Sequence, residues 1–591
     1  KDLTVNFNPH YTRDSDGNIK FSEEDNNPNP NPGAIQTTQS SHEDISLHSE
    51  ITFAYGNWIE YYLLIIGYEI GFGTFWRFPY LVFNNGGGIF VVIFFINLII
   101  IGGPIFYLDT FFGQIYKKGP VEFFGYIHKK FSGLGWASIS VVWMLSTYYM
   151  SIILWGYYYF FASFQNPLPW AKDNLKDKNG NEIPFINPDY FRNHVLEISE
   201  GLHDMGGFSI ERFSCLILTY ATIFFCIVKG ISTTSKVVYV TTPAPIIILL
   251  ILFFNGMQLD GAMEGVYFLF VPDFSRILDY KIWIAASNQV IYVLSLGLGM
   301  NFIFSKYRNR TDSVSNTALF NCSCLMFFGI LCAIINFFYL GNLSLTLNIP
   351  VKDLPIEGSD LAFITYPAAL SVLPWPNVWC IIFFLMLITL GIDTQFSFLE
   401  VVSYYVYKNF LKEKGYSKTH ASLLICGVGF CTGLAFITRG GYHLFLLFDK
   451  SVTLISAFTI CLLELLVAYY YVGESKLRKL SLKVTKEDFP EYCMFVYKIL
   501  GPVVLAFFIL LALFKTLFMN DDFSQEAGKE LIWPYIVEFI IIFIPLAFIA
   551  YFYYTYKDEE KKEEHEKINE MVQIHNIEDI IDEQHQDSEH H

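Results

Sequence analysis

One apolar stretch near the start of the chain, GYEIGFGTFWRFPY from Gly67 to Tyr80, contains an acid, an arginine, a proline and three glycines. Hydrocarbon tolerates non-helical backbone only where protein or a watery cavity satisfies the freed N–H and C=O groups. Gly67, Gly71 and Gly73 therefore predict a helix that is deliberately broken inside the membrane. A span that glycine softens for close packing on a neighbour is the simpler alternative.

The fold class follows from the distribution of apolar residues. The 591 residues are 53% hydrophobic, and the apolar residues come in blocks of about twenty or more, which indicates an all-α polytopic membrane protein with about twelve transmembrane helices. The expected spans are 58–83, 89–115, 134–164, 210–228, 236–255, 282–305, 316–341, 376–407, 419–437, 443–472, 493–518 and 531–556.

Three regions are expected along the chain: a disordered tail at 1–50, a transmembrane domain at 51–556 and an acidic tail at 557–591. Basic residues gather in alternate short loops, which predicts that both tails are cytoplasmic. The tails account for much of the net charge of −17, and this charge argues against nucleic-acid binding. The second tail is either a solvated helical extension or a helix that docks a protein partner.

Four motifs resemble the neurotransmitter:sodium symporter family over roughly residues 55 to 555. They are the stretch quoted above, GGPIFYLDTFFGQ from Gly102 to Gln114, SLGLG from Ser295 to Gly299, and FFLMLITLGIDTQF from Phe383 to Phe396. The resemblance implies two five-helix inverted repeats with broken first and sixth spans. The glycines of SLGLG agree independently, because corresponding breaks in two halves point to a central site.

The resemblance also implies one sodium site between the first and eighth spans. Its ligands are the carbonyls of Gly67, Ile70 and Leu390, the carboxylate of Asp393 and the hydroxyl of Thr394. Na⁺ is a hard cation that prefers oxygen, and a carboxylate at mid-membrane needs a cation beside it. The alternative is a buried acid that hydrogen-bonds to backbone without an ion.

A second sodium site and the chloride site of the family do not carry over completely. Gln289 and Asn321 match the family, and the positions that differ are Thr74, Phe94, Val293 and Leu325. A dehydrated anion needs hydrogen-bond donors, and valine, leucine and phenylalanine offer none. We therefore expect transport without chloride dependence.

Glu69 stands where the family usually has a small residue. An acid near the membrane centre is costly unless it is paired or protonated, and it is functional by default. Three uses are open: a salt bridge to a cationic solute, replacement of the lost ion ligands, or a proton-carrying acid. A buried structural hydrogen bond is the remaining alternative.

The expected solute pocket surrounds Gly71. Monoamine-carrying members have Asp at this position, so glycine resembles the amino-acid-carrying members, in which a tyrosine matching Tyr149 helps to bind the substrate carboxylate. In the family, the sodium ion of the second site also helps to hold the substrate carboxylate. Because that site is incomplete here, the interpretation as an amino-acid carrier is weakened. The remaining wall is expected from Glu69, Leu145, Tyr292, Leu298, Gln395 and Phe398.

Two gates are expected above and below this pocket. Arg77 and Asp449 match the outer pair of the family, and a guanidinium suits a bidentate clasp. At the inner gate Tyr307 is retained, and the positions that differ are Thr52, Tyr55 and Lys408. Other contacts must therefore hold the inner end.

These features predict a sodium-coupled symporter that moves a small amino acid or related amine by alternating access. Its partners are the small-molecule solute and membrane lipid, and the chain is not an enzyme. The expected location, by resemblance, is the plasma membrane. The alternative is a non-transporting membrane protein of the same fold that acts as a sensor or as a structural subunit of a larger assembly.

Overall fold

The structure is a computed structural model that describes residues 12–13, 19–20, 58–171, 175–176, 182–183, 190–228, 231–354, 361–371, 373–518 and 533–556. The predicted tails lie outside these residues, apart from the short strands β1 (Thr12–Arg13) and β2 (Ile19–Lys20), which pair antiparallel. Thr52 and Tyr55 also lie outside them. A second antiparallel pair joins β3 (Leu175–Lys176) and β4 (Glu182–Ile183).

Helices make up most of the described part, and η marks a short 3₁₀ or π segment. The first group is α2 (Trp58–Glu69), η1 (Gly73–Arg77), α3 (Phe78–Asn84), α4 (Gly88–Asn97), η2 (Leu98–Gly102), α5 (Gly103–Tyr116), α6 (Pro120–Ile127), η3 (Lys129–Phe131), α7 (Ser132–Ala162), η4 (Pro169–Ala171), η5 (Tyr190–Val195), α8 (Ile210–Ile227), α9 (Ile231–Thr241) and α10 (Pro243–Gly256). The second group is α11 (Ala262–Phe270), η6 (Phe274–Arg276), α12 (Tyr280–Val293), α13 (Met300–Ser305), α14 (Val314–Leu347), η7 (Val351–Asp353), η8 (Leu361–Thr365), α15 (Tyr366–Ser371), α16 (Pro376–Val406) and η9 (Tyr407–Leu411). The third group is α17 (Lys418–Phe436), α18 (Gly441–Ser451), α19 (Ser456–Leu466), η10 (Val467–Gly473), α20 (Glu474–Leu480), η11 (Ser481–Thr485), α21 (Glu491–Phe495), η12 (Val496–Leu500), α22 (Gly501–Phe518) and α24 (Trp533–Tyr556).

Ten helices within the described residues are long and apolar enough to cross a membrane. The first and sixth expected spans are both interrupted, as α2 with α3 and as α12 with α13, and the tenth is divided between α18 and α19. The predicted all-α polytopic fold is therefore confirmed.

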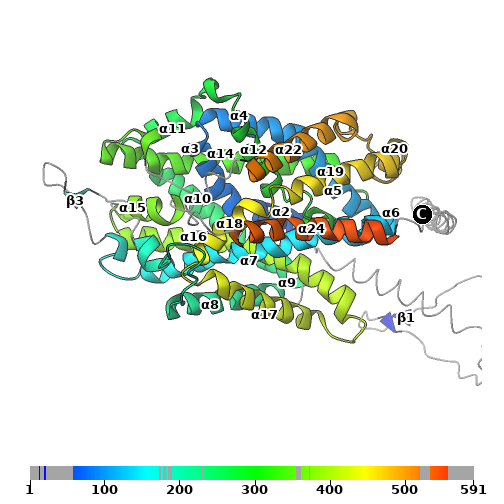
Figure 1. The fold of residues 1–591 in the computed structure, drawn as a ribbon, viewed down its shortest axis with the longest axis horizontal. Helices are drawn as coiled ribbons and strands as arrows, with labels where there is room; N and C mark the ends of the chain where they lie inside the picture. The colour runs from blue at the N-terminus through cyan, green and yellow to red at the C-terminus, as the bar shows by residue number, and fades with distance from the viewer. Residues whose placement is uncertain are drawn as a thin grey trace, which may run out of the picture. The chain divides into compact units, whose positions relative to one another are not determined.

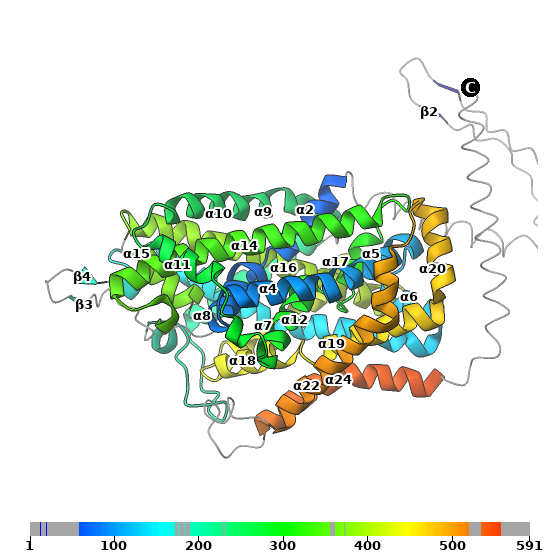
Figure 2. The same cartoon turned by 90° about the horizontal axis from the view of Figure 1, so that it is seen from above.

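The described helices between residues 58 and 556 run largely along one common direction (Figure 1). The long helices α7 and α16 pack against each other, and α8 and α17 lie side by side at one edge (Figure 1). In the view of Figure 2, α9 and α10 lie at one edge, and α22 and α24 lie at the other. Packing of α2 and α10 on α16 brings the first and fifth spans to the eighth.

The first span breaks after Glu69. Ile70 still donates its N–H to the carbonyl of Ile66 at 2.8 Å, and regular bonding resumes when Phe75 donates to Gly71 at 3.0 Å. The Thr74 hydroxyl donates to the carbonyl of Glu69 at 2.6 Å and so satisfies one freed group. This is the compensation that a break in apolar surroundings requires.

The sixth span breaks between Val293 and Met300. Ser295, Gly297 and Gly299 in this turn have positive φ of 49°, 68° and 75°. Positive φ favours glycine because a Cβ is strained there. A Cβ on Gly299 would also lie 2.5 Å from a side-chain carbon of Pro120. The glycines of the motif thus permit both the turn and its close packing on α6.

Candidate functional site

Oxygen atoms gather where α16 passes the break of the first span. The Thr394 hydroxyl lies 3.2 Å from the carbonyl oxygen of Tyr68 and 3.5 Å from that of Leu390. Asp393, the preceding residue, is buried, and its Oδ1 has no hydrogen-bond partner among the described residues. The orphaned carboxylate oxygen and the all-oxygen donor set fit a hard cation such as Na⁺.

Gly67 faces this carboxylate at close range. A Cβ at Gly67 would lie 2.9 Å from Oδ2 of Asp393 and 2.4 Å from the hydroxyl of Thr242. Any larger residue would push the first span away from the eighth. The fifth expected ligand, Ile70, is buried in the break itself.

Thr242, which the sequence reasoning missed, belongs to this cluster. It directly precedes α10, and its hydroxyl lies 3.1 Å from Oδ2 of Asp393 and 3.2 Å from the carbonyl oxygen of Leu63. It orients one carboxylate oxygen and leaves the other unpaired. The local sequence Thr-Thr-Pro does not predict this contact, because the partner, Asp393, lies on a different span.

The expected solute pocket lies on the other side of Thr394. The hydroxyl of Tyr149, on α7, accepts the N–H of Phe72 at 3.3 Å. A Cβ at Gly71 would lie 2.3 Å from the Thr394 hydroxyl and 3.0 Å from that of Tyr149. The ring of Phe398 meets the Tyr149 ring edge-on at 5.6 Å. Gly71 thus lies between the Thr394 hydroxyl and the aromatic side chains of Tyr149 and Phe398.

The other expected wall residues come from α7, α12, α16 and the turn between α12 and α13. Tyr292 lies against Gly73, where a Cβ would be 2.8 Å from its ring. Gln395 donates to the carbonyl of Ser146 at 2.8 Å, and its own Oε1 has no partner among the described residues. Two further wall residues, Leu145 and Leu298, are buried.

Glu69 is the last residue of α2 and is 2% exposed. Neither carboxylate oxygen has a hydrogen-bond partner within the described residues. The groups on which its charge acts include Tyr61 on α2 and two thiols of α14, those of Cys322 and Cys324. Groups of its own helix and of the seventh span are therefore within electrostatic range of this carboxylate.

The remnant of the second ion region lies on the same helix, α14. The side-chain amide of Asn321 is buried and has no hydrogen-bond partner in the described part of the chain. Gln289 uses its amide to donate to the carbonyl of Gly73 at 2.6 Å. Phe94 packs edge-on against the ring of Phe78, with centroids 4.9 Å apart. The region offers few donors to an anion.

At the expected outer gate, Arg77 approaches Asp449 through a single contact. NH1 of Arg77 lies 3.5 Å from Oδ1 of Asp449, and Tyr148 donates to the same oxygen at 3.1 Å. The guanidinium also stacks on the ring of Tyr292, 4.6 Å from its centroid. Arg77 is thus held by one carboxylate oxygen and one aromatic face, not by the expected bidentate clasp.

The opposite end is held by Lys408, which replaces an acid of the family. Its ammonium pairs with Glu122 of α6 at 2.8 Å, and Tyr405 donates to the other oxygen of Glu122 at 2.7 Å. Burial raises the pKa of Glu122, but the Lys408 charge and these hydrogen bonds outweigh burial and lower the pKa. The retained Tyr307 lies beside Lys306, whose ammonium is 5.3 Å from the ring centroid.

Arg308 adds a second contact at this end. Its guanidinium lies 4.8 Å from the centroid of the Tyr61 ring on α2, and it donates to Oε1 of Gln114 at 2.8 Å. It also pairs with Asp312 at 3.6 Å. Arg308 thus ties the first half-helix to α5 and to the loop before α14.

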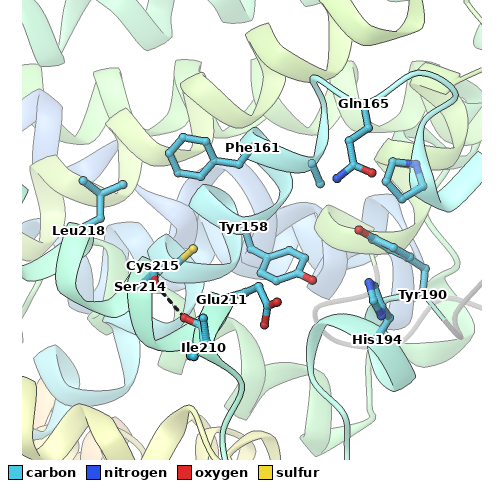
Figure 3. A pocket seen from close by; sticks show the side chains of 12 residues that line it. Tyr158, Phe161, Gln165, Tyr190, His194, Ile210, Glu211, Ser214, Cys215 and Leu218 are labelled. Carbon is cyan, nitrogen blue, oxygen red and sulfur yellow. Dashed lines mark hydrogen bonds between the residues drawn. The ribbon is translucent and has the colours of Figure 1, made fainter.

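A cavity of about 760 Å³ lies between the end of α7 and the start of α8. Figure 3 shows the Tyr158 and Tyr190 side chains with Glu211 and His194 around it. None of the expected site residues lines this cavity. It is therefore separate from the site at the broken spans.

Comparison with known proteins agrees with these motifs. A family model described as the sodium:neurotransmitter symporter family matches residues 53–555. The chain belongs to this family. It is 34% identical to the sodium- and chloride-dependent taurine transporter of Rattus norvegicus, over 71% of each chain. It is 32% identical to the creatine transporter of Torpedo marmorata over 72% of each chain, and 30% identical to the sodium- and chloride-dependent glycine transporter 1 of Xenopus laevis over 77% of each chain.

Membership confirms the resemblance inferred from the four motifs. The protein is an integral multi-pass membrane protein of a sodium-symporter family and not an enzyme. The roles of the individual site residues remain predictions.

The Arg77 contact gives a mutational test. We expect Arg77→Lys to lower the maximal uptake rate despite its conserved charge, because an ammonium loses the planar face that stacks on Tyr292. The matched control is Arg276→Lys, since Arg276 makes an exposed pair with Asp279 at 3.8 Å. Unaltered uptake by Arg77→Lys would contradict the gate assignment.

Proposed function

We propose that this chain is a sodium-coupled symporter of a small amino acid or related amine, that it works by alternating access, and that it needs no chloride. The observation that carries the proposal is the buried carboxylate of Asp393, with one unpaired oxygen, beside the Thr394 hydroxyl at the break of the first span. The residues that would hold Na⁺ are Gly67, Ile70, Leu390, Asp393 and Thr394. Relatives named for taurine, creatine and glycine support the solute class.

The solute's carboxylate would bind beside Gly71. The N–H of Phe72 and the hydroxyl of Tyr149 lie there, 3.3 Å apart, and an incoming carboxylate could take both hydrogen bonds. A side chain at position 71 would collide with Tyr149 and Thr394. This crowding supports a solute that brings its own carboxylate rather than a protein acid at this position.

Chloride independence rests on missing hydrogen-bond donors. The side chain of Phe94 is buried and offers none. The buried side chains of Val293 and Leu325 add no donor. The chain would thereby differ from the relatives that are named chloride-dependent.

Of the three uses of Glu69, the position of its carboxylate favours replacement of lost ion ligands. Its charge acts toward α14, where the buried amide of Asn321 also lacks a partner in the described residues. A carboxylate and an amide oxygen suit a hard cation. We therefore propose a second cation site that Glu69 and Asn321 form together.

The location of the protein follows the loop charges. Lys117, Lys306, Lys408 and Arg308 gather at the end opposite to the Arg77–Asp449 pair, and the positive-inside rule makes that end cytoplasmic. We propose the plasma membrane as the location, with both tails in the cytoplasm. A protein partner of the second tail is part of the same proposal.

Uptake into proteoliposomes tests the function directly. We expect counterflow of a labelled amino acid or amine in Na⁺ but not in K⁺, and the same rate when gluconate replaces chloride. A wide solute panel is needed, because the pocket fixes a class and not one compound. If no solute is transported, the result would favour the alternative, a non-transporting sensor or structural subunit. A steep chloride requirement would refute only the chloride independence.

Asp393 gives a test that does not require a known solute. Binding stabilises a folded protein by about 2.7 kcal/mol when the ligand is at a hundred times its Kd. We expect Na⁺ to raise the melting temperature of the solubilised protein relative to K⁺, and Asp393→Asn to abolish most of this difference. Glu400→Gln, a buried acid on the same helix, is the control. A melting temperature indifferent to Na⁺ in the unmodified protein would exclude the site.

Glu69→Gln separates the uses of that residue. If Glu69 ligates a cation, the concentration of Na⁺ for half-maximal uptake should rise by roughly 10- to 100-fold, as expected for loss of a charge-assisted interaction of about 1.5–3 kcal/mol. Solute affinity at saturating Na⁺ should stay nearly constant. Loss of solute affinity instead would assign Glu69 to the solute, and a flattened pH profile alone would assign it to a proton.

A further inference from the structure

The segment of residues 196–207 lies between η5 and α8 and is bonded to the turn that precedes α18. Ser199 donates its N–H to the carbonyl of Arg439 at 3.2 Å. The N–H of Arg439 in turn donates to the carbonyl of Gly207 at 3.2 Å. The backbone of this turn is therefore held by two different parts of one segment, which has no role in the function proposed above.

The 196–207 segment and the turn approach so closely that two positions exclude a side chain. Gly440 donates its N–H to the carbonyl of Met205 at 3.3 Å, and a Cβ on Gly440 would lie 2.9 Å from the sulfur of Met205. Gly206 has a φ of 56°, and a Cβ there would lie 2.8 Å from Cδ of Arg439. Glycine at these two positions therefore permits the contact.

Glu197 ties the same segment to α8. Its Oε2 accepts from Nη2 of Arg212 at 2.9 Å and lies 3.5 Å from Nε of Arg439. Arg212 is in the first turn of α8 and is 2% exposed. A cation there opposes the helix dipole, and a buried charge needs a partner, so Glu197 compensates for both. Glu197 itself has a φ of 49°, a strained conformation for a residue with a Cβ, which the surrounding contacts must maintain.

The contacts continue into α18, the helix that carries Asp449. Nε2 of His443, in the first turn of α18, lies 2.9 Å from the carbonyl oxygen of Ser199. Because a carbonyl oxygen can only accept, the ring nitrogen donates this hydrogen bond. Asp449 follows six residues later on the same helix, about 9 Å along its axis. The position of the start of α18 therefore determines where the Asp449 carboxylate lies relative to Arg77.

We propose that the 196–207 segment positions α18 and thereby holds the Asp449 carboxylate opposite Arg77. This inference rests on the proposed symporter function, because the Arg77–Asp449 pair is a gate only in a transporter. The pair is a single contact of 3.5 Å, so a small displacement of α18 removes it. Glu197 and Gly206 act through this helix and are positioning residues of the outer gate.

Two neighbouring glycines of the segment give a test that needs no known solute. Gly206→Ala places a methyl group against Arg439 in a strained backbone, whereas Gly207→Ala adds one where no heavy atom beyond its chain neighbours lies within 4 Å in the described part. In hydrogen–deuterium exchange of the solubilised protein, we expect the amides of α18 to exchange roughly tenfold faster in Gly206→Ala and at the unmodified rate in Gly207→Ala. Unchanged exchange across α18 in Gly206→Ala would overturn the proposal.

The melting temperature of both variants should respond to Na⁺ as that of the unmodified protein does, because the Asp393 cluster lies on other elements. Should Gly206→Ala fail to fold, Arg439→Gln replaces it. That change removes the 3.5 Å pair with Glu197 and keeps the backbone bonds of the turn. We expect it also to speed exchange across α18, and exchange at the unmodified rate would contradict the positioning role.

Uptake into proteoliposomes tests whether the segment acts through the gate. We expect Gly206→Ala to lower the maximal uptake rate by about 5-fold, and its combination with Asp449→Asn to be no slower than Asp449→Asn alone, because residues that act through one interaction are not additive. Losses that multiply would assign the segment to stability only and overturn the proposal. If the unmodified protein moves no solute, the symporter function fails, while the exchange result still decides whether the segment positions α18.

Discussion

The interruption of the first span after Glu69 is the constraint on which the other features depend. A break in apolar surroundings leaves backbone groups unpaired, and each needs a partner from another element. Thr394 lies at the carbonyl of Tyr68, the hydroxyl of Tyr149 accepts from Phe72, and Thr74 donates to the carbonyl of Glu69. The same contacts that make the break tolerable therefore assemble the proposed sodium site and the proposed solute pocket.

Motifs predicted those parts of the molecule that lie close together in sequence or need a special backbone. The glycines of the first and sixth spans correctly predicted where the helices break, because positive φ and close backbone approach exclude other residues. Neighbouring Asp393 and Thr394 could be paired with the first span by resemblance. The sequence did not reveal Thr242, because its position depends on how the fifth span packs on the eighth.

Long-range ion pairs were equally hidden. Lys408 looked like a lost gate residue, yet it pairs with Glu122, which is 286 positions away. The packing of the Gly297 turn on Cys461 of α19 was hidden in the same way. A single residue in the sequence does not predict such a pair, because the tertiary packing determines which residue lies beside it.

The two ends of the molecule differ in how firmly they are held. The Arg77 end relies on a 3.5 Å ion pair and one aromatic face, whereas the Lys408 end combines a 2.8 Å pair with the contacts of Arg308. One Na⁺ that crosses a potential of 100 mV supplies about 2.3 kcal/mol, and one charge-assisted hydrogen bond is worth about 1.5–3 kcal/mol. A single ion can therefore offset about one such bond. In the proposed alternating-access cycle, opening of the Lys408 end would require its bonds to be exchanged one after another for water or for new partners, rather than broken together.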